Sequence, residues 1–373
     1  MTLPAKLRRV WLDVHLWIGV GLLVALVPLS VTGSILVWHD QLDRALYAHR
    51  YVVSGPVVSR PVETYAKAAQ AAFGERAQLT QVRLPQKTGD PVVAVGRMPG
   101  EPGPGARPRS LNAWIDPPTA RLLDTAEVAK GFSMVMHRVH GSLLIPDIGR
   151  KVVGWLGWAM FVSSATGMWL WWPRNGGFLK GLRWRRGAST LFNLHHMVGF
   201  WICVPLAVLS LTGVYISFPQ ASRELFGLPT QPPRPTGPGR FAPPIMPQLT
   251  ISQAIAAAQA SVPGTVVEVS LPIQGKEPVW RIGLKSPGAE RPETVQVVDA
   301  TGRVKDARGG QAGDPPPKDE ISPLMRRIHD GAGMGLAWQT IIFLGGIAPA
   351  LLSITGLVVW LRRRTRQQGV FID

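Results

Sequence analysis

A four-residue pattern, Ser-x-Thr-Gly, occurs four times in this chain of 373 residues. The copies begin at Ser30, Ser164, Ser210 and Ser353, and each lies inside a long apolar run. About 20 apolar residues in a helix are enough to cross the hydrocarbon core of a membrane. Small residues in such a helix let another helix, or a flat ligand, approach its backbone closely. The pattern therefore predicts long apolar helices that pack closely in lipid.

Four histidines keep a fixed register with these motifs. The spacing from histidine to glycine is the same within two pairs: His15 to Gly33 and His195 to Gly213, then His140 to Gly167 and His329 to Gly356. The chain is therefore a tandem duplication, and each half carries two apolar segments and two histidines. Two parallel halves imply a pseudo-two-fold axis along the membrane normal.

The charge distribution predicts the orientation in the membrane. A formal net charge of +17 is compatible with nucleic-acid binding. Much of the excess borders the apolar runs, so the positive-inside rule explains it better, and no nucleic acid is expected as a partner. The N-terminus, the loop at 174–193 and the C-terminus are the basic ends. We expect these three parts in the cytoplasm and both soluble segments on the outer side.

The predicted fold is a membrane four-helix bundle, built as a tandem 2+2 repeat, with two small α+β outer domains. We expect helices at 62–73 and 251–260 in these domains, with short strands after each. Asp116 and Asp299 are interpreted as turn residues rather than metal ligands. The predicted segments are a transmembrane helix at 10–38, a soluble domain at 39–135, an outer interfacial segment with His140 at 136–151, a helix at 152–172, a basic loop at 173–193, a helix at 194–218, a soluble domain with a Pro-rich linker at 219–336, a helix at 337–361 and a basic tail at 362–373.

The duplicated histidines suggest two cofactor sites, one near each face. His15 and His195 lie near the cytoplasmic starts of their helices, and His140 and His329 lie on the outer side. Two neutral imidazoles can supply both axial ligands of a haem iron, and helix bundles hold cofactors between their helices. The alternative is that each histidine is an interfacial residue with one hydrogen bond. His196 and His137 are reserve ligands, because they lie next to these positions without a duplicate partner.

The outer histidines require a break in the helix. Each lies 26 residues before its threonine (140 to 166, 329 to 355), which would carry it beyond a core of about 30 Å. Pro146, and the glycines at 331, 333 and 335, are expected to fold the chain back. The motif glycines near the ends of the other helices should then contact the haems. Gly167 and Gly356 should contact the inner haem, and Gly33 and Gly213 the outer haem.

Other cofactor classes have no support in the sequence. Cys203 is the single cysteine, which excludes an internal disulfide, a Cys-x-x-Cys-His haem attachment and an iron–sulfur pattern. We identify no nucleotide-binding motif, and no catalytic residue. An electron donor would therefore bind from outside the chain, as a cytoplasmic reductase or a membrane quinol.

The sequence resembles the PepSY-associated transmembrane family over nearly its whole length. The resemblance rests on His15-Leu16-Trp17-Ile18-Gly19, Leu194-His195-His196-Met197-Val198-Gly199, His137-Arg138-Val139-His140 with Gly149-Arg150, Trp171-Trp172-Pro173-Arg174, the Ser-x-Thr-Gly helix ends, and two helix–strand segments that end in Asp-x-x-Thr turns. Within this family it is similar to the inner-membrane ferric-siderophore reductases, which are di-haem proteins with outer PepSY-type domains.

This resemblance implies two b-type haems in a bacterial inner-membrane protein that delivers electrons to a ferric siderophore or other ferric chelate in the periplasm. Two alternatives remain open: a non-enzymatic regulatory protein that restrains a peptidase, and a siderophore permease. The outer domains are expected to dock the substrate, or else to present a solvated basic surface. The cations concerned are Arg97, Arg107, Arg109, Arg281, Lys285 and Arg291.

Overall fold

The computed structural model describes residues 3–98, 109–173, 177–184, 187, 189–228, 243–289, 292–305 and 319–368. The chain divides into two compact units. The helical unit comprises Met1–His39, Val135–Thr230 and Pro317–Asp373, and the sheet unit comprises Asp40–Met134 and Gln231–Pro316. The loop predicted at 99–108 and residues 229–242 of the predicted linker lie outside the described residues.

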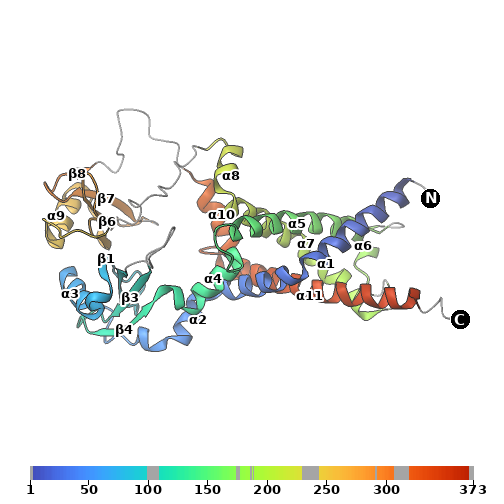
Figure 1. The fold of residues 1–373 in the computed structure, drawn as a ribbon, viewed down its shortest axis with the longest axis horizontal. Coiled ribbons are helices and arrows are strands. Elements are labelled where there is room, and N and C mark those ends of the chain that lie inside the picture. Colours follow the sequence, from blue (N-terminus) through green and yellow to red (C-terminus); the bar gives the residue numbers. More distant parts are fainter. Residues whose placement is uncertain are drawn as a thin grey trace. The chain divides into compact units, whose positions relative to one another are not determined.

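Four long helices run side by side in the helical unit (Figure 1). They are α1 (Leu3–Val37), α5 (Gly149–Trp171), α7 (Thr190–Ser217) and α11 (Gly335–Gln368). Helix α1 packs against α11 and α5, while α7 packs against α5 and α11. The four therefore form a ring in which α1 and α7 lie diagonally opposite each other.

Three of these helices are long and apolar enough to cross a membrane. The segments with this length and composition are Lys6–Val37, Thr190–Ser217 and Gly335–Arg362. Helix α5 has 23 residues, starts with Gly149, Arg150 and Lys151, and is rich in Gly, Ser and Trp. Its composition alone therefore does not identify a fourth span.

Short helices precede α5 and α11, and the predicted breaks are present at both places. Helix α4 (Phe132–Ser142) is followed by a loop containing Pro146, in which Leu143, Leu144 and Asp147 adopt positive φ. Helix α10 (Ile321–Asp330) ends at Gly331, whose φ is 77° and whose N–H donates to the Arg327 carbonyl. Both helices can therefore fold back toward the ring instead of extending α5 and α11 outward. The other short helices are α2 (His39–Leu46), η1 (Ala48–Tyr51), η2 (Gly74–Arg76), η3 (Val128–Lys130), α6 (Phe178–Gly181) and α8 (Pro219–Leu225).

The sheet unit contains one antiparallel sheet of eight strands in the order β4-β3-β2-β1-β5-β6-β7-β8. The strands are β1 (Gln78–Arg83), β2 (Val92–Arg97), β3 (Ser110–Ile115), β4 (Leu122–Glu127), β5 (Thr265–Ser270), β6 (Val279–Lys285), β7 (Glu293–Val298) and β8 (Val304–Lys305). Helices α3 (Val62–Phe73) and α9 (Ile251–Ser261) pack against the sheet and against each other. Each soluble segment thus supplies one of these helices and four strands, as the predicted repeat requires.

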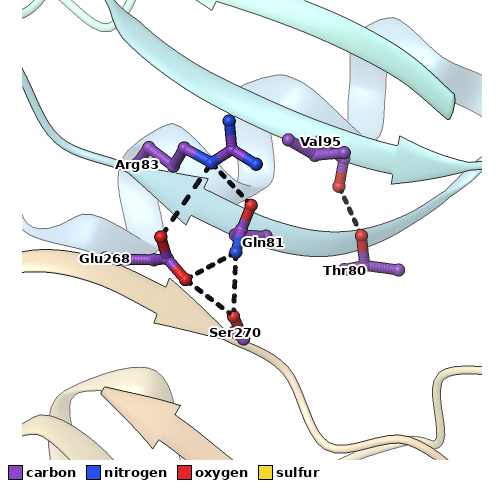
Figure 2. A network of polar contacts seen from close by, with 6 residues as sticks. All are labelled: Thr80, Gln81, Arg83, Val95, Glu268 and Ser270. Carbon is purple, nitrogen blue, oxygen red and sulfur yellow. Dashed lines mark hydrogen bonds and ion pairs between the residues drawn. The ribbon is translucent and has the colours of Figure 1, made fainter. Parts of the chain in front are cut away.

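The two soluble segments meet where β1 pairs with β5. Gln81 lies opposite Ser270, Val82 opposite Val269 and Arg83 opposite Glu268. Gln81 Nε2 donates to Glu268 Oε1 at 2.6 Å, and Arg83 Nε donates to Gln81 Oε1 at 2.7 Å (Figure 2). The sequence predicted two separate domains, whereas the strands form a single sheet with one hydrophobic core that draws on both segments.

A buried carboxylate secures the matching turn in each half of the sheet unit. Asp116 accepts hydrogen bonds from Ser54 N at 2.7 Å and Ser54 Oγ at 2.6 Å. Burial opposes its ionisation, but the hydrogen bonds from Ser54 and Thr119 hold the pKa of Asp116 below its ordinary value. Asp299 accepts from Trp280 Nε1 at 2.8 Å and Gln248 N at 2.9 Å. Both residues therefore serve as turn residues, as the sequence suggested.

The junction between β1 and β5 can be tested with a disulfide. The Leu84 N–H bonds to Val267 O and the Leu271 N–H to Thr80 O, so Gln81 and Ser270 form a non-hydrogen-bonded pair, in which side chains lie closest. We expect Gln81→Cys/Ser270→Cys to oxidise to an intramolecular disulfide, measured by mass spectrometry and gel mobility without reductant. Val82→Cys/Ser270→Cys is the matched control, because Val82 is fully buried on the helix-covered face. Efficient cross-linking of the control, or none in the first variant, would contradict the shared sheet.

Candidate functional site

The first histidine pair lies across the ring of long helices. His15 comes from α1 and His195 from α7, the two diagonal helices. Their ring centroids are 6.4 Å apart and their planes are at 87°. The sequence assigned both to the cytoplasmic end, and the structure brings them together.

The second pair comes from the two short helices. His140 of α4 and His329 of α10 have ring centroids 6.0 Å apart and an interplanar angle of 43°. Because α4 and α10 fold back, these histidines reach the level of the motifs at the far ends of α1 and α7. The second predicted pair is therefore also assembled.

Each imidazole is held by the Ser-x-Thr-Gly motif of another helix. In all four cases Nδ1 bonds to the threonine hydroxyl, to the carbonyl three residues before that threonine, or to both. The contacts are His15 Nδ1 with Ser163 O and Thr166 Oγ1, both at 3.1 Å, His195 Nδ1 with Thr355 Oγ1 at 3.2 Å, His140 Nδ1 with Leu29 O at 2.9 Å, and His329 Nδ1 with Thr212 Oγ1 at 3.0 Å.

These contacts determine which ring nitrogen carries the proton. A carbonyl oxygen can only accept, so Nδ1 must be the donor wherever it meets one. The threonine hydroxyls also act as acceptors, because each donates its own hydrogen within its helix, as Thr212 does to Val208 O at 2.8 Å. The lone pair therefore resides on Nε2 of each histidine, the form in which imidazole binds a metal.

The motif glycine makes room for the imidazole. A Cβ on Gly33 would lie 2.7 Å from Cε1 of His140, and on Gly167 it would lie 3.2 Å from Cε1 of His15. Gly213 has the same relation to His329, and Gly356 to His195, each at 3.2 Å. The sequence assigned these glycines to the same faces as these histidines, and in the structure the flat group on each glycine is an imidazole ring.

Burial favours the neutral form of the outer histidines, His140 and His329. Burial lowers the pKa of His140. Burial first, and then the proximity of His140, lowers the pKa of His329 to about 4. Both imidazoles are therefore uncharged at neutral pH and available as ligands.

The geometry of each pair fits a haem iron. Two imidazoles that bind one metal ion from opposite sides, each at about 2 Å, have ring centroids roughly 6 Å apart. Across the described ranges, no group of three His, Cys, Asp or Glu side chains is placed to hold a metal ion. A metal held by two imidazoles alone would need further ligands, and a porphyrin supplies four in one plane. The residues present therefore fit an iron porphyrin better than a bare ion.

The reserve ligands are not members of either pair. His196 stacks between Trp171 and Phe192, with ring centroids 6.0 and 5.9 Å away. His137 is exposed on α4, one turn before His140. Of the predicted docking cations, Arg281 and Lys285 lie on β6 and Arg109 pairs with Glu127 at 3.9 Å. Arg107 and Arg291 lie outside the described residues.

Comparison with known families agrees with this architecture. The family model described as the PepSY-associated TM region matches residues 12–363. The chain belongs to this family. Together with three membrane-capable helices, this makes it a membrane protein whose partner is a lipid bilayer. No curated protein matches the chain. The PepSY-associated family model covers all four histidines and all four motifs.

Alanine substitutions at the glycines test the cradle directly. Gly33→Ala should displace His140 and lower the thermal unfolding temperature, because overpacking typically costs about 1–3 kcal/mol. Gly213→Ala should act in the same direction but less, since its contact is longer.

The matched controls are Gly21→Ala in α1 and Gly199→Ala in α7, where a Cβ meets nothing within 4 Å. Alanine favours helices, so both controls should be neutral or stabilising. The measurement is thermal unfolding in detergent. Equal effects of Gly33→Ala and Gly21→Ala would argue against the imidazole contact.

Proposed function

We propose that this PepSY-associated membrane protein binds two b-type haems, one at His15–His195 and one at His140–His329, and carries electrons across the membrane to a ferric chelate outside. The observation that carries the proposal is the repetition of one arrangement four times. Each histidine donates Nδ1–H to a helix motif, rests on a glycine and keeps Nε2 for a metal. A bound haem iron supplies a one-electron ferric/ferrous couple.

In this proposal the protein residues fix the orientation of the iron ligands and surround them with apolar side chains. The Nδ1 hydrogen bonds set ring orientation and raise the basicity of Nε2, as second-shell acceptors do in metal sites. The backbone carbonyls and threonines are fixed in helices, so little reorganisation is needed when the iron changes charge. Leu22, Leu26 and Leu29 of α1, with Leu156 and Met160 of α5, line an apolar pocket between these two helices.

The spacing of the pairs suits transfer across a bilayer. His140 bonds to Leu29 of α1, and His15 lies in the same helix. Between His15 and Leu29, at about 1.5 Å per residue, α1 rises about 21 Å. This distance covers most of a hydrocarbon core of about 30 Å, so the two proposed haems would serve the two faces.

The proposed topology follows from the basic ends of the helices. α5 is the fourth span in this proposal, because it packs in the ring with three membrane-capable helices. The termini and the 173–193 loop would be cytoplasmic in a bacterial inner membrane, and the sheet unit periplasmic. The donor would be a quinol or a cytoplasmic reductase. The acceptor would be a ferric siderophore or a similar chelate, for which the sheet unit would provide the docking surface.

The alternative functions do not explain the histidine geometry. A protein that restrains a peptidase, or a siderophore permease, has no need for four imidazoles in one tautomer that meet in pairs. The arrangement is explained if each pair binds a metal centre.

Single histidine substitutions test the proposal. His15→Ala or His195→Ala should remove one haem per chain and leave the other, and His140→Ala or His329→Ala should do the reverse. Haem content and redox-resolved visible spectra of purified protein measure this. His49→Ala is the control, since His49 is an exposed residue of the sheet unit that bonds to Asp124. Two haems with unchanged spectra in all four variants would refute the assignment and bring His196 and His137 forward.

A further inference from the structure

Helices α4 and α10 each carry a basic residue at an equivalent position of the duplication, although the residue type differs. His137 precedes His140 in α4 by the same spacing with which Arg326 precedes His329 in α10 (137 to 140, 326 to 329). Residues three apart lie on one face of a helix, so each basic side chain lies on the same face as its histidine. The pseudo-two-fold therefore places one basic group beside each member of the outer pair.

These two side chains are available to bind a ligand. Both are exposed, and the described part of the chain offers neither a hydrogen bond nor an ion pair. The nearest acid in α10, Asp330, one turn after Arg326, has its Oδ1 bonded to the Ala332 N–H at 2.9 Å.

Other basic residues lie close to His137. Burial first, and then the neighbouring His39, Arg326 and Arg150, lowers the pKa of His137. These neighbours come from the starts of α2 and α5 as well as from α10, so His137 and Arg326 lie near each other. A neutral imidazole still donates one N–H to an acceptor.

We propose that His137 and Arg326 form a carboxylate-binding site beside the outer histidine pair. An imidazole N–H and a guanidinium, from helices related by the pseudo-two-fold, can together bind two carboxylates of one ligand, and guanidinium is well suited to carboxylate oxygens. The inference deepens the proposed function and rests on it. The carboxylates belong either to the propionates of a haem held by His140 and His329, or to a ferric chelate that approaches this pair.

The variants that test the site are Arg326→Gln, His137→Gln and the double variant, each in the full-length protein in detergent. Arg138→Gln is the matched control, because it removes a charge from the same exposed helix one residue later, on a different face. One arm measures the rate at which the outer haem transfers to apomyoglobin, for protohaem and for its dimethyl ester. The other arm measures binding of ferric citrate and of a neutral ferric hydroxamate by calorimetry.

Loss of a charge-assisted contact should change one of these quantities by roughly tenfold in the double variant, and by less than about twofold in Arg138→Gln. Faster loss of protohaem, but not of the dimethyl ester, identifies propionates as the ligand. Weaker binding of ferric citrate, but not of the hydroxamate, identifies the chelate. If neither arm changes, or Arg138→Gln has the same effect, the site is overturned. Absence of haem in the wild-type protein would refute the proposed function instead, and the ferric citrate arm would then decide this inference alone.

Discussion

The hydrogen bond from a histidine Nδ1 to the backbone or threonine of a neighbouring helix is the interaction on which the helical unit depends. It is favoured by the glycine one residue after the threonine, because a Cβ there would lie 2.7 Å from the ring at Gly33 and 3.2 Å from it at the other three glycines. It also needs the helices to approach closely, which Gly346 allows between α1 and α11: a Cβ there would lie 3.1 Å from Ser30 O. One polar contact in an apolar interior thus accounts for the small residues of the motif, the tautomer of the histidine and the packing distance of the helices.

The duplication makes these contacts interdependent. Helix α1 supplies His15 to the motif of α5 and offers its own motif to His140. Helix α7 does the same with His195 and His329. These contacts lie within one half, whereas each histidine pair and the packing of α1 on α11 and of α5 on α7 join the two halves. The same exchange occurs in the sheet unit, where β1 and β5 join the two soluble segments into one sheet. Neither half alone can form a histidine pair or the whole sheet.

The sequence predicted the elements well, because their signals are local. The helix at 62–73 agrees with α3, and the breaks at Pro146 and Gly331 occur as predicted. The histidine pairs were predicted from register, which is preserved by duplication. The continuous sheet was not predicted, since alternation of apolar residues identifies a strand but not the edge it pairs with. The threonine contacts were also missed, although Thr166, Thr212 and Thr355 are in the motif, because the rotation of a helix about its axis is set by packing.

The most direct test of the account is electron paramagnetic resonance of the oxidised, haem-loaded wild-type protein at low temperature, together with its haem-to-protein ratio. The central claim is that each histidine pair supplies both axial ligands of one haem. Perpendicular imidazole planes leave the iron d orbitals nearly degenerate and give a strongly anisotropic low-spin ferric signal, whereas planes at a smaller angle give a more ordinary rhombic one. With interplanar angles of 87° at the inner pair and 43° at the outer pair, the account predicts two haems per chain and one signal of each kind. A high-spin spectrum, or a protein that retains no haem after expression with adequate haem, would contradict it.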